Sequence, residues 1–169
     1  TWHFVTPADI RWLLMLTAPR VQALNAYQYR KCELDDKLFA RSRKVLEKVL
    51  QGGQQLTRNE LRDKFEAAGI NTQIELRMTH IMAWAELEGV VCSGARRGKQ
   101  FTYMLLDERV PAMPSISRDE ALFKLTKRYF TSHGPATIQD FVWWSGLTVT
   151  DTRRGLEMAK ADLIEEVIN

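Results

Sequence analysis

The sequence contains only two cysteines, Cys32 and Cys92, among its 169 residues. Two cysteines form at most one disulfide and cannot build a metal cluster of the CxxC type. So few thiols fit a reduced, cytoplasmic setting. The three histidines, His3, His80 and His133, lie far apart in the sequence and share no metal-ligand spacing. We therefore expect no bound metal.

Long hydrophobic runs are also missing from the chain. The nearest approach, residues 10–16, is interrupted by Arg11 and is far shorter than the roughly 18 apolar residues of a membrane span. The first residues lack the basic stretch and apolar segment of a secretory signal peptide. Hydrophobic residues make up 45% of the chain and charged residues 27%, as in an ordinary globular protein. We therefore expect no membrane partner.

Motifs of the common enzyme classes are absent as well. The sequence has no GxSxG, HExxH, P-loop or GxGxxG string. Most carboxylates have a different explanation, because they lie where a helix cap is expected. The chain by itself therefore shows no active site, and we expect no cofactor.

Helix starts are the strongest signal that is present. A Ser or Thr followed three residues later by an acid forms a capping box, which satisfies two backbone N–H groups. Six such pairs each open an apolar-periodic run: Thr6 with Asp9, Thr57 with Glu60, Thr72 with Glu75, Ser117 with Glu120, Thr137 with Asp140, and Thr148 with Asp151. With the periodic runs at 20–30 and 34–50, they predict helices over 7–17, 20–30, 34–50, 57–68, 72–88, 117–132, 137–145 and 148–160.

The hydrophobic period changes to that of strands in a few places. Residues 90–93 and 101–105 are strand-like and flank a glycine-containing turn over 94–100, which predicts a β-hairpin. Residues 163–168 and the first four residues predict further strands. The fold class is therefore mainly α with small β-hairpins (α+β).

The order of these elements predicts tandem winged-helix (helix-turn-helix) units, because each unit has three helices followed by strand signals. The first unit covers 34–106, and the second covers 117–169 with an incomplete wing. Residues 107–116 contain two prolines and form a linker, and residues 1–33 pack on the first unit. Since the chain begins without Met, we expect a piece of a longer protein that contacts a missing N-terminal segment.

Basic residues are the candidate binding groups. The net charge is only +3, so any basic surface must be local. The candidates are the wing cluster (Arg96, Arg97 and Lys99), the basic stripe (Lys37, Arg41, Lys44 and Lys48) and three arginines of the third helices (Arg77, Arg153 and Arg154). In winged-helix proteins the third helix enters the major groove and nearby elements hold phosphate. The other interpretation of each group is a solvated surface, although the lack of acids over 94–100 favours the wing cluster.

Two adjacent tryptophans allow two interpretations. Trp143 and Trp144 could form a base-stacking platform. Their short helix also contains Phe141, with Leu147 close behind it, and this setting favours core packing.

Several strings resemble a known family. Residues 129–137 (YFTSHGPAT) and 140–147 (DFVWWSGL) are similar to the signature of a bacterial winged-helix DNA-binding family. Residues 92–100, residues 106–111, and the opening Thr1-Trp2-His3 with Asp9-Ile10-Arg11-Trp12-Leu13 match it too. That family includes DNA glycosylases that release alkylated bases and unhook interstrand crosslinks.

The resemblance implies a bacterial DNA-repair protein built from tandem winged-helix units. It implies double-stranded DNA as the partner, a cytoplasmic, nucleoid-associated location, and no cofactor or metal. The family's hydrolytic motif, a Gln-aliphatic-Gln string that positions the attacking water, has no match here, since Gln28-Tyr29-Arg30 and Gln54-Gln55-Leu56 differ from it. No catalytic residue is therefore carried over. Either the motif lies in a missing N-terminal segment or this member only binds.

Three functions remain open at this point. The first is a DNA-binding fragment of a glycosylase-like repair protein. The second is a winged-helix transcription regulator, which would need a basic recognition helix and two-fold symmetry. The third is a protein-interaction module without DNA affinity, which the near-neutral charge of residues 56–169 favours.

Overall fold

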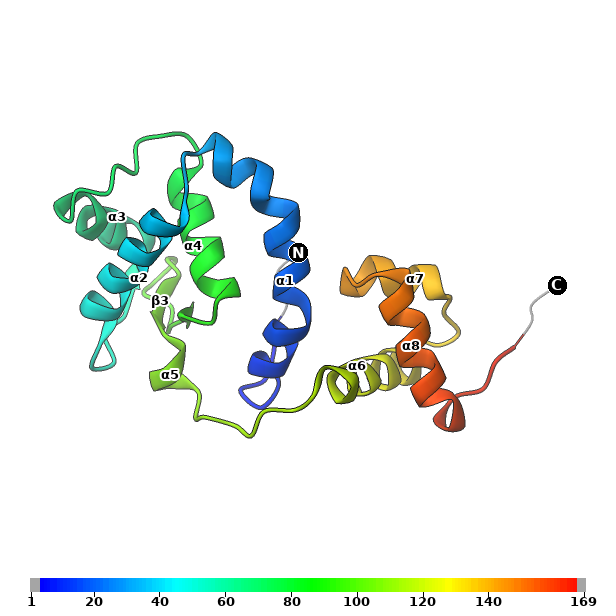
Figure 1. Ribbon diagram of the computed structural model, residues 1–169. Coiled ribbons are helices and arrows are strands. Elements are labelled where there is room, and N and C mark those ends of the chain that lie inside the picture. The colour runs from blue at the N-terminus through cyan, green and yellow to red at the C-terminus, as the bar shows by residue number, and fades with distance from the viewer. Residues whose placement is uncertain (1–3, 167–169) are drawn as a thin grey trace. The chain divides into compact units, whose positions relative to one another are not determined.

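The structure is a computed structural model that describes residues 4–166 (Figure 1). It divides into two compact units. The first holds the chain up to Arg11 together with Gln22–Met113, and the second holds Trp12–Val21 together with the chain from Pro114 onward. The elements in chain order are α1 (Ile10–Lys31), α2 (Asp36–Leu50), β1 (Leu56–Thr57), α3 (Arg58–Ala67), α4 (Arg77–Leu87), β2 (Val91–Ser93), β3 (Thr102–Leu105), α5 (Leu106–Arg109), α6 (Arg118–His133), α7 (Ile138–Ser145), α8 (Val149–Ala159) and the 3-10 helix η1 (Lys160–Asp162).

The first unit combines helices with a small antiparallel sheet in the order β1-β3-β2. Leu56 of β1 pairs with Tyr103 of β3, and Cys92 of β2 pairs with Met104 of β3. The mainly helical α+β class and the predicted hairpin are confirmed. The short strand β1 and the helical turn α5 are additional elements that the sequence pattern did not predict.

The core of the first unit lies between α2, α3 and α4. These helices are amphipathic or apolar, and they bury their apolar faces against one another because this removes hydrocarbon from water. The fully buried side chains include Leu46, Leu50, Leu61, Phe65, Ile70, Ile81, Met82 and Ala85. Cys32 and Cys92 are buried free thiols.

Four of the six predicted helix starts are confirmed. Thr57, Ser117, Thr137 and Thr148 are N-caps whose side chains accept the backbone N–H three residues further on. Thr57 and Thr137 complete the reciprocal box with their acids. The start at Thr6 is wrong: α1 begins at Ile10, and no side chain caps it.

The predicted start of α4 at Thr72 is wrong too. Glu66 accepts the Thr72 backbone N–H at 2.7 Å and the Thr72 hydroxyl, so this threonine caps no helix. The helix begins at Arg77 instead, behind Leu76, which has φ +63° and gives no side-chain cap. Thr72 thus bonds a carboxylate six residues earlier in the chain instead of capping the helix that the local pattern predicts.

The helices predicted over 7–17 and 20–30 are one helix, with no break at Pro19 between them. Proline inside a helix removes one backbone hydrogen bond and costs about 3 kcal/mol. Yet α1 runs through Pro19 as one helix of 22 residues. Its side chains are buried on both sides of the proline, with Leu16 in the core of the second unit and Tyr29 in that of the first, and this packing offsets the local cost.

The second unit is built from α6, α7 and α8 and a segment of α1. Its buried cluster comprises Trp12, Leu16, Ala121, Leu122, Leu125, Tyr129, Phe141 and Leu147. Because Trp12 and Leu16 belong to this cluster, residues 1–33 do not pack on the first unit as a whole, contrary to the sequence-based expectation.

The predicted terminal strands are not found in the part of the chain that the structure describes. Residues 163–166 follow η1 as irregular chain, and the remaining predicted positions, 167 and 168, lie outside the described residues. Phe4 is not in a strand, and Thr1 to His3 lie outside the described residues as well.

No helix between residues 4 and 166 has the length and apolar character that a membrane span requires.

Candidate nucleic-acid interface

The loop that joins β2 to β3 is the wing that the sequence pattern predicts, and that name is kept for it below. Its tip is closed by two hydrogen bonds: Arg97 N–H donates to Gln100 O at 3.0 Å, and Gln100 N–H donates to Arg97 O at 3.1 Å. Only Gly98 and Lys99 lie between this pair. Gly98 has φ +62°, a conformation that favours glycine, so the sequence supplies the residue that the tight turn requires.

Arg97 is bonded to the start of α3. Its guanidinium donates to Glu60 Oε1 at 2.7 Å and to Gln55 O at 2.7 Å. Glu60 is also the acid of the Thr57 capping box. The backbone N–H of Thr57 and the Arg97 guanidinium together lower the pKa of Glu60 to about 2. Arg97 is therefore ion-paired within the unit, and it braces the wing rather than leaving its charge free.

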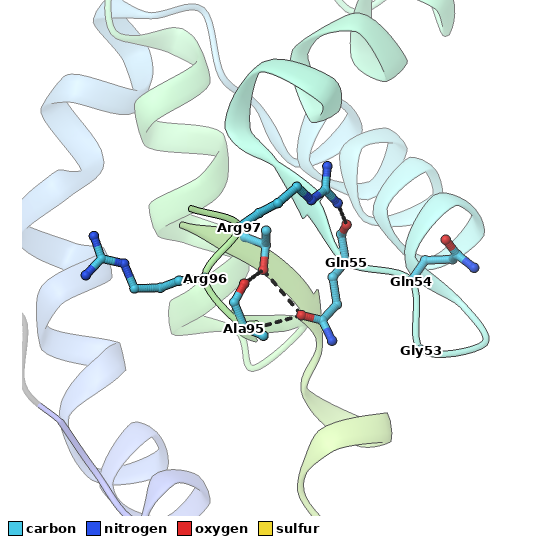
Figure 2. A pocket seen from close by; sticks show the side chains of 7 residues that line it. Gly53, Gln54, Gln55, Ala95, Arg96 and Arg97 are labelled. Atoms are coloured by element: carbon cyan, nitrogen blue, oxygen red, sulfur yellow. Dashed lines mark hydrogen bonds between the residues drawn. The ribbon is translucent and has the colours of Figure 1, made fainter. Parts of the chain in front are cut away.

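Gln55 holds the base of the wing. Its Oε1 accepts the Ala95 backbone N–H at 2.6 Å, and the Thr102 hydroxyl donates to Ala95 O at 2.6 Å. Figure 2 shows these bonds at the edge of an open hollow of about 370 Å³ lined by Gly53, Gln54, Gln55, Ala95, Arg96, Arg97 and Thr102. The wing is thus fixed to the residue that precedes β1, through a Gln55 side chain that the sequence pattern did not identify as part of the site.

All three cations of the wing cluster are exposed, but Arg96 and Lys99 differ from Arg97 in their pairing. Neither Arg96 nor Lys99 has an ion pair among residues 4–166. The Arg96 guanidinium lies over the Phe101 ring, with its carbon 4.8 Å from the ring centroid. The structure therefore leaves two of the three predicted wing cations available for an anionic partner.

The basic stripe of α2 lies on the surface, as its spacing predicts. Lys37, Arg41, Lys44 and Lys48 are all exposed. Arg41 donates to Ala68 O and to the neighbouring Gly69 O, at the C-terminal end of α3. Arg97 contacts the N-terminal end of the same ten-residue helix, which is about 15 Å long. Arg41 of the basic stripe and Arg97 of the wing cluster therefore contact opposite ends of α3.

The prediction that Arg77 faces solvent is wrong. Arg77 is only 6% exposed. Its guanidinium donates to Cys32 O at 2.8 Å, to Asn71 O at 3.2 Å and to Glu33 Oε2 at 2.6 Å. It joins the end of α1 to the start of α4 and is unavailable to DNA.

Helix α4 as a whole is poorly placed to bind an external partner. His80 packs edge-on against Tyr29, with ring centroids 5.7 Å apart, and burial lowers the pKa of His80. Thr79 is the exposed position between Arg77 and Leu87 and accepts a hydrogen bond from Arg58 at 2.6 Å. The third helix of this unit is thus mainly a core helix.

One carboxyl of α4 makes the stability of the unit depend on pH. Burial raises the pKa of Glu86 from its ordinary 4.5 to about 7, against the opposing effect of Arg58. Between these values the folded chain holds a proton that the unfolded chain has lost, so stability falls as pH rises through this window. Glu86→Gln should therefore be about 2 kcal/mol more stable than the wild type at pH 8. Urea denaturation at pH 4 and pH 8 measures this, and an equal difference at both pH values would contradict it.

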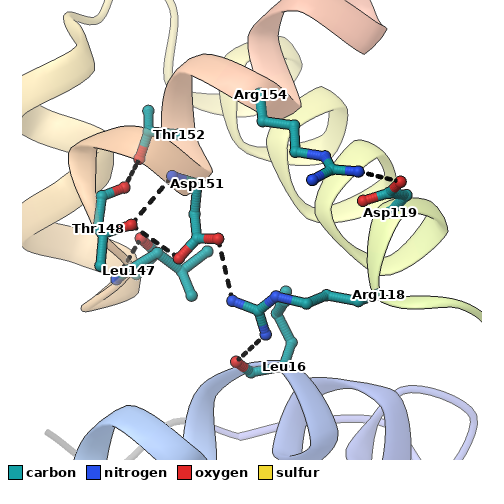
Figure 3. Close-up of polar contacts among 9 residues, drawn as sticks. Leu16, Arg118, Asp119, Leu147, Thr148, Asp151, Thr152 and Arg154 are labelled. Carbon is teal, nitrogen blue, oxygen red and sulfur yellow. Dashed lines mark hydrogen bonds and ion pairs between the residues drawn. The ribbon is translucent and has the colours of Figure 1, made fainter.

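The second unit presents its own arginines on α8. Arg154 pairs with Asp119 at 2.6 Å, and Arg118 pairs with Asp151 at 3.0 Å while also donating to Leu16 O (Figure 3). Arg153 is exposed on the same helix and enters none of these bonds. Of the two predicted α8 arginines, Arg153 is therefore the better placed to meet a partner.

The two tryptophans of α7 are both exposed, so the core interpretation is wrong for both, although they are exposed to different degrees. Trp143 is 80% exposed. Trp144 is 41% exposed and packs against Tyr129 at 5.0 Å and Phe141 at 6.3 Å between ring centroids. Both follow a fully formed capping box, so the helix itself is well anchored. Helical spacing alone did not reveal that only the second indole turns inward.

This difference predicts unequal effects of two adjacent substitutions. Trp144→Ala should lower the free energy of unfolding by about 2 kcal/mol, because it removes aromatic packing at a half-buried site. Trp143→Ala should change it by less than about 0.5 kcal/mol, as expected of a surface side chain. Thermal melts of both variants measure the pair, and equal losses would mean that the indoles share one environment.

No group of three or more His, Cys, Asp or Glu side chains is placed to hold a metal in the described part of the chain. The site is therefore described by its cations and aromatic side chains. Sequence reasoning missed Phe101 and Gln55 as parts of it. The predicted hairpin, whose second strand begins at Phe101 directly after the basic turn, was the signal that could have found the first.

Comparisons with known proteins point in one direction. The family model described as "DNA glycosylase AlkZ-like" matches residues 1–168. The solved structure of Streptomyces sahachiroi DNA glycosylase AlkZ is similar in fold, with a TM-score of 0.70 at 24% sequence identity. The match covers 93% of this chain and 44% of that one, so the chain spans less than half the length of this relative. No curated protein matches the sequence.

Proposed function

Because the chain belongs to the AlkZ-like DNA glycosylase family, we propose that it is the double-stranded DNA-binding part of a DNA-repair protein. The observation that supports this most directly is the wing of the first unit. Arg96 and Lys99 project there without an ion-pairing acid among the described residues, and the loop over 94–100 contains no acid. Exposed cations on a braced hairpin suit contacts to phosphate.

We assign a winged-helix architecture to the first unit. Helices α2, α3 and α4 precede the β2–β3 hairpin, and the short strand β1 between α2 and α3 completes the sheet. This is the order of a winged-helix module, in which the hairpin is the wing. Since α4 is largely covered, the wing rather than the third helix is the DNA contact of this unit.

The second unit repeats the helical part of that order. In it α6, α7 and α8 follow one another, and a turn at Gly146 with φ +69° joins α7 to α8. Thr150 and Arg153 are exposed on α8, and both residue types can bond base edges in a major groove. We propose α8 as a second DNA contact, with Arg154 held back by Asp119.

The basic stripe is proposed as a third contact, to the phosphate backbone. Lys37, Lys44 and Lys48 are exposed along one side of α2. Arg41 is already engaged with α3, so we expect less from it. No residue of this chain is proposed as catalytic.

A protein-interaction module is the second candidate function. Its support is the pair of exposed apolar side chains Leu24 and Tyr27 on α1. An apolar surface of this kind suits a protein partner better than a phosphate backbone.

Charge removal at the wing tests the DNA-binding proposal. The double variant Arg96→Ala/Lys99→Ala should bind a labelled duplex about tenfold more weakly, and its salt slope should be smaller by about 2. The matched control Lys31→Ala/Lys160→Ala removes the same charge from other exposed positions. Fluorescence anisotropy across a salt series measures both. Equal behaviour of the two double variants would remove the wing from the proposal.

A further inference from the structure

The wing has two chemically different faces. Arg97 and Gln100 form its closing pair, and Arg97 turns toward α3, where it pairs with Glu60. The Arg96 guanidinium lies over the Phe101 ring, so these two side chains share the other face. Figure 2 shows the Arg96 and Arg97 side chains leaving the hairpin in opposite directions. One face is bonded to α3 through Glu60, and the other presents a guanidinium on an aromatic ring.

Phe101 is the member of this face whose exposure needs an explanation. Its side chain is 65% exposed, and its described contact is the Arg96 guanidinium at 4.8 Å. A phenyl ring gains nothing from a phosphate group, whereas it gains from contact with bases and sugars. Phosphate binding alone therefore explains why Arg96 and Lys99 are exposed, but it does not explain why Phe101 is exposed.

The hairpin is also held so that this face cannot fold back onto the unit. Arg97 bonds Glu60 and Gln55 on one side, and the Gln55 side chain fixes Ala95 at the base. A braced hairpin loses little freedom on binding, so an exposed ring at its end is presented in a fixed place.

From these observations we infer that Phe101 is a wedge that enters a base step of duplex DNA from the minor groove, with Arg96 beside it. The minor groove is only about 6 Å wide, and it admits the edge of a two-residue hairpin turn rather than a helix. Its negative potential attracts arginine, and apolar side chains that enter it unstack a base step and kink the duplex by about 20–90°. The wedge rests on the proposed function, since it needs DNA as the partner.

DNA bending provides the test. A duplex of about 25 base pairs, labelled at both ends, reports bending by energy transfer when the 169-residue chain binds. The wild type should raise the transfer efficiency. Phe101→Ala should abolish that rise and weaken binding about tenfold, whereas Phe101→Leu, which keeps an apolar wedge, should retain most of both. Because Phe101 is exposed, a thermal melt should show both variants folded.

Lys99→Ala is the matched control from the same turn. It should weaken binding and reduce the salt slope by about 1 without changing the transfer efficiency at saturation. If the wild type binds DNA without bending it, or if Phe101→Ala bends DNA like the wild type, the wedge is refuted and DNA binding stands. If the wild type binds no DNA at low salt, the proposed function fails and the wedge fails with it. A Phe101→Ala variant that changes only the oligomeric state would identify the ring as a protein contact and refute the wedge.

Discussion

Arg77→Ala should lower the free energy of unfolding of the first unit by about 3 kcal/mol. The guanidinium is buried and donates to two backbone carbonyls, Cys32 O and Asn71 O, and to the Glu33 carboxylate. Alanine would leave both carbonyls without a donor inside the protein, at about 1–3 kcal/mol for each unsatisfied group. Urea denaturation followed by circular dichroism measures the loss.

The control for Arg77 is the exposed Arg153. Arg153→Ala should stay within about 0.5 kcal/mol of the wild type. Arg77→Lys keeps the charge but not the fork of donors, so it should remain clearly destabilised. A stable Arg77→Ala variant with weakened DNA binding would restore the surface role that the sequence pattern suggested.

Gly155→Ala should destabilise the second unit by about 2 kcal/mol, although alanine is the better helix former by about 1 kcal/mol. The reason is the close approach of α8 to α6. A Cβ atom at position 155 would overlap the Thr126 hydroxyl and lie 3.2 Å from Thr126 Cβ and 3.4 Å from Leu122 O. Since Thr126 Cβ is attached directly to the backbone of α6 and cannot rotate away, the helices themselves would have to move apart. A thermal melt measures the effect.

Thr126 offers a compensating substitution for Gly155→Ala. Its hydroxyl is buried and has no hydrogen-bond partner among the described residues, so removing it sacrifices no bond. Thr126→Ala in the Gly155→Ala background should therefore recover about half of the lost stability. A Gly155→Ala protein that melts at or above the wild-type temperature would show that α6 and α8 are not closely packed here.

Local structure could largely be predicted from the sequence. The caps at Thr57, Ser117, Thr137 and Thr148 depend on residues three positions apart, and such signals are complete within one turn of chain. The β2–β3 hairpin is equally local, because its turn glycine and its strand period lie within 16 residues. Features that depend on packing between distant residues could not be predicted in this way, and the unbroken helix through Pro19 is an example.

The sequence predicts where the candidate site lies, but not which of its cations are free of ion pairs. The sequence identifies Arg96, Arg97 and Lys99 as one cluster, yet Arg97 pairs with Glu60, 37 residues earlier in the chain. The same limit explains Arg77, whose three acceptors lie 6 to 45 residues away. A charge pattern shows where cations are, whereas their availability depends on distant partners.

The exposed Trp143 illustrates a related limit. Both α7 tryptophans are apolar and adjacent, so composition favours the core for each. A helix turns by 100° per residue, and only one of two neighbours can face the same partner. Trp144 takes that place against Tyr129 and Phe141, and Trp143 is left in solvent.

The salt dependence of DNA binding tests the central claim most directly. Two free wing cations predict a slope of log affinity against log salt of about −2, and the three free lysines of the basic stripe would extend it to about −4.5. The measurement is the affinity of the wild-type chain for a labelled duplex from low to physiological salt. A slope within this range is the expected result. No binding at low salt, or an affinity that salt leaves unchanged, would contradict the account and favour the protein-interaction module.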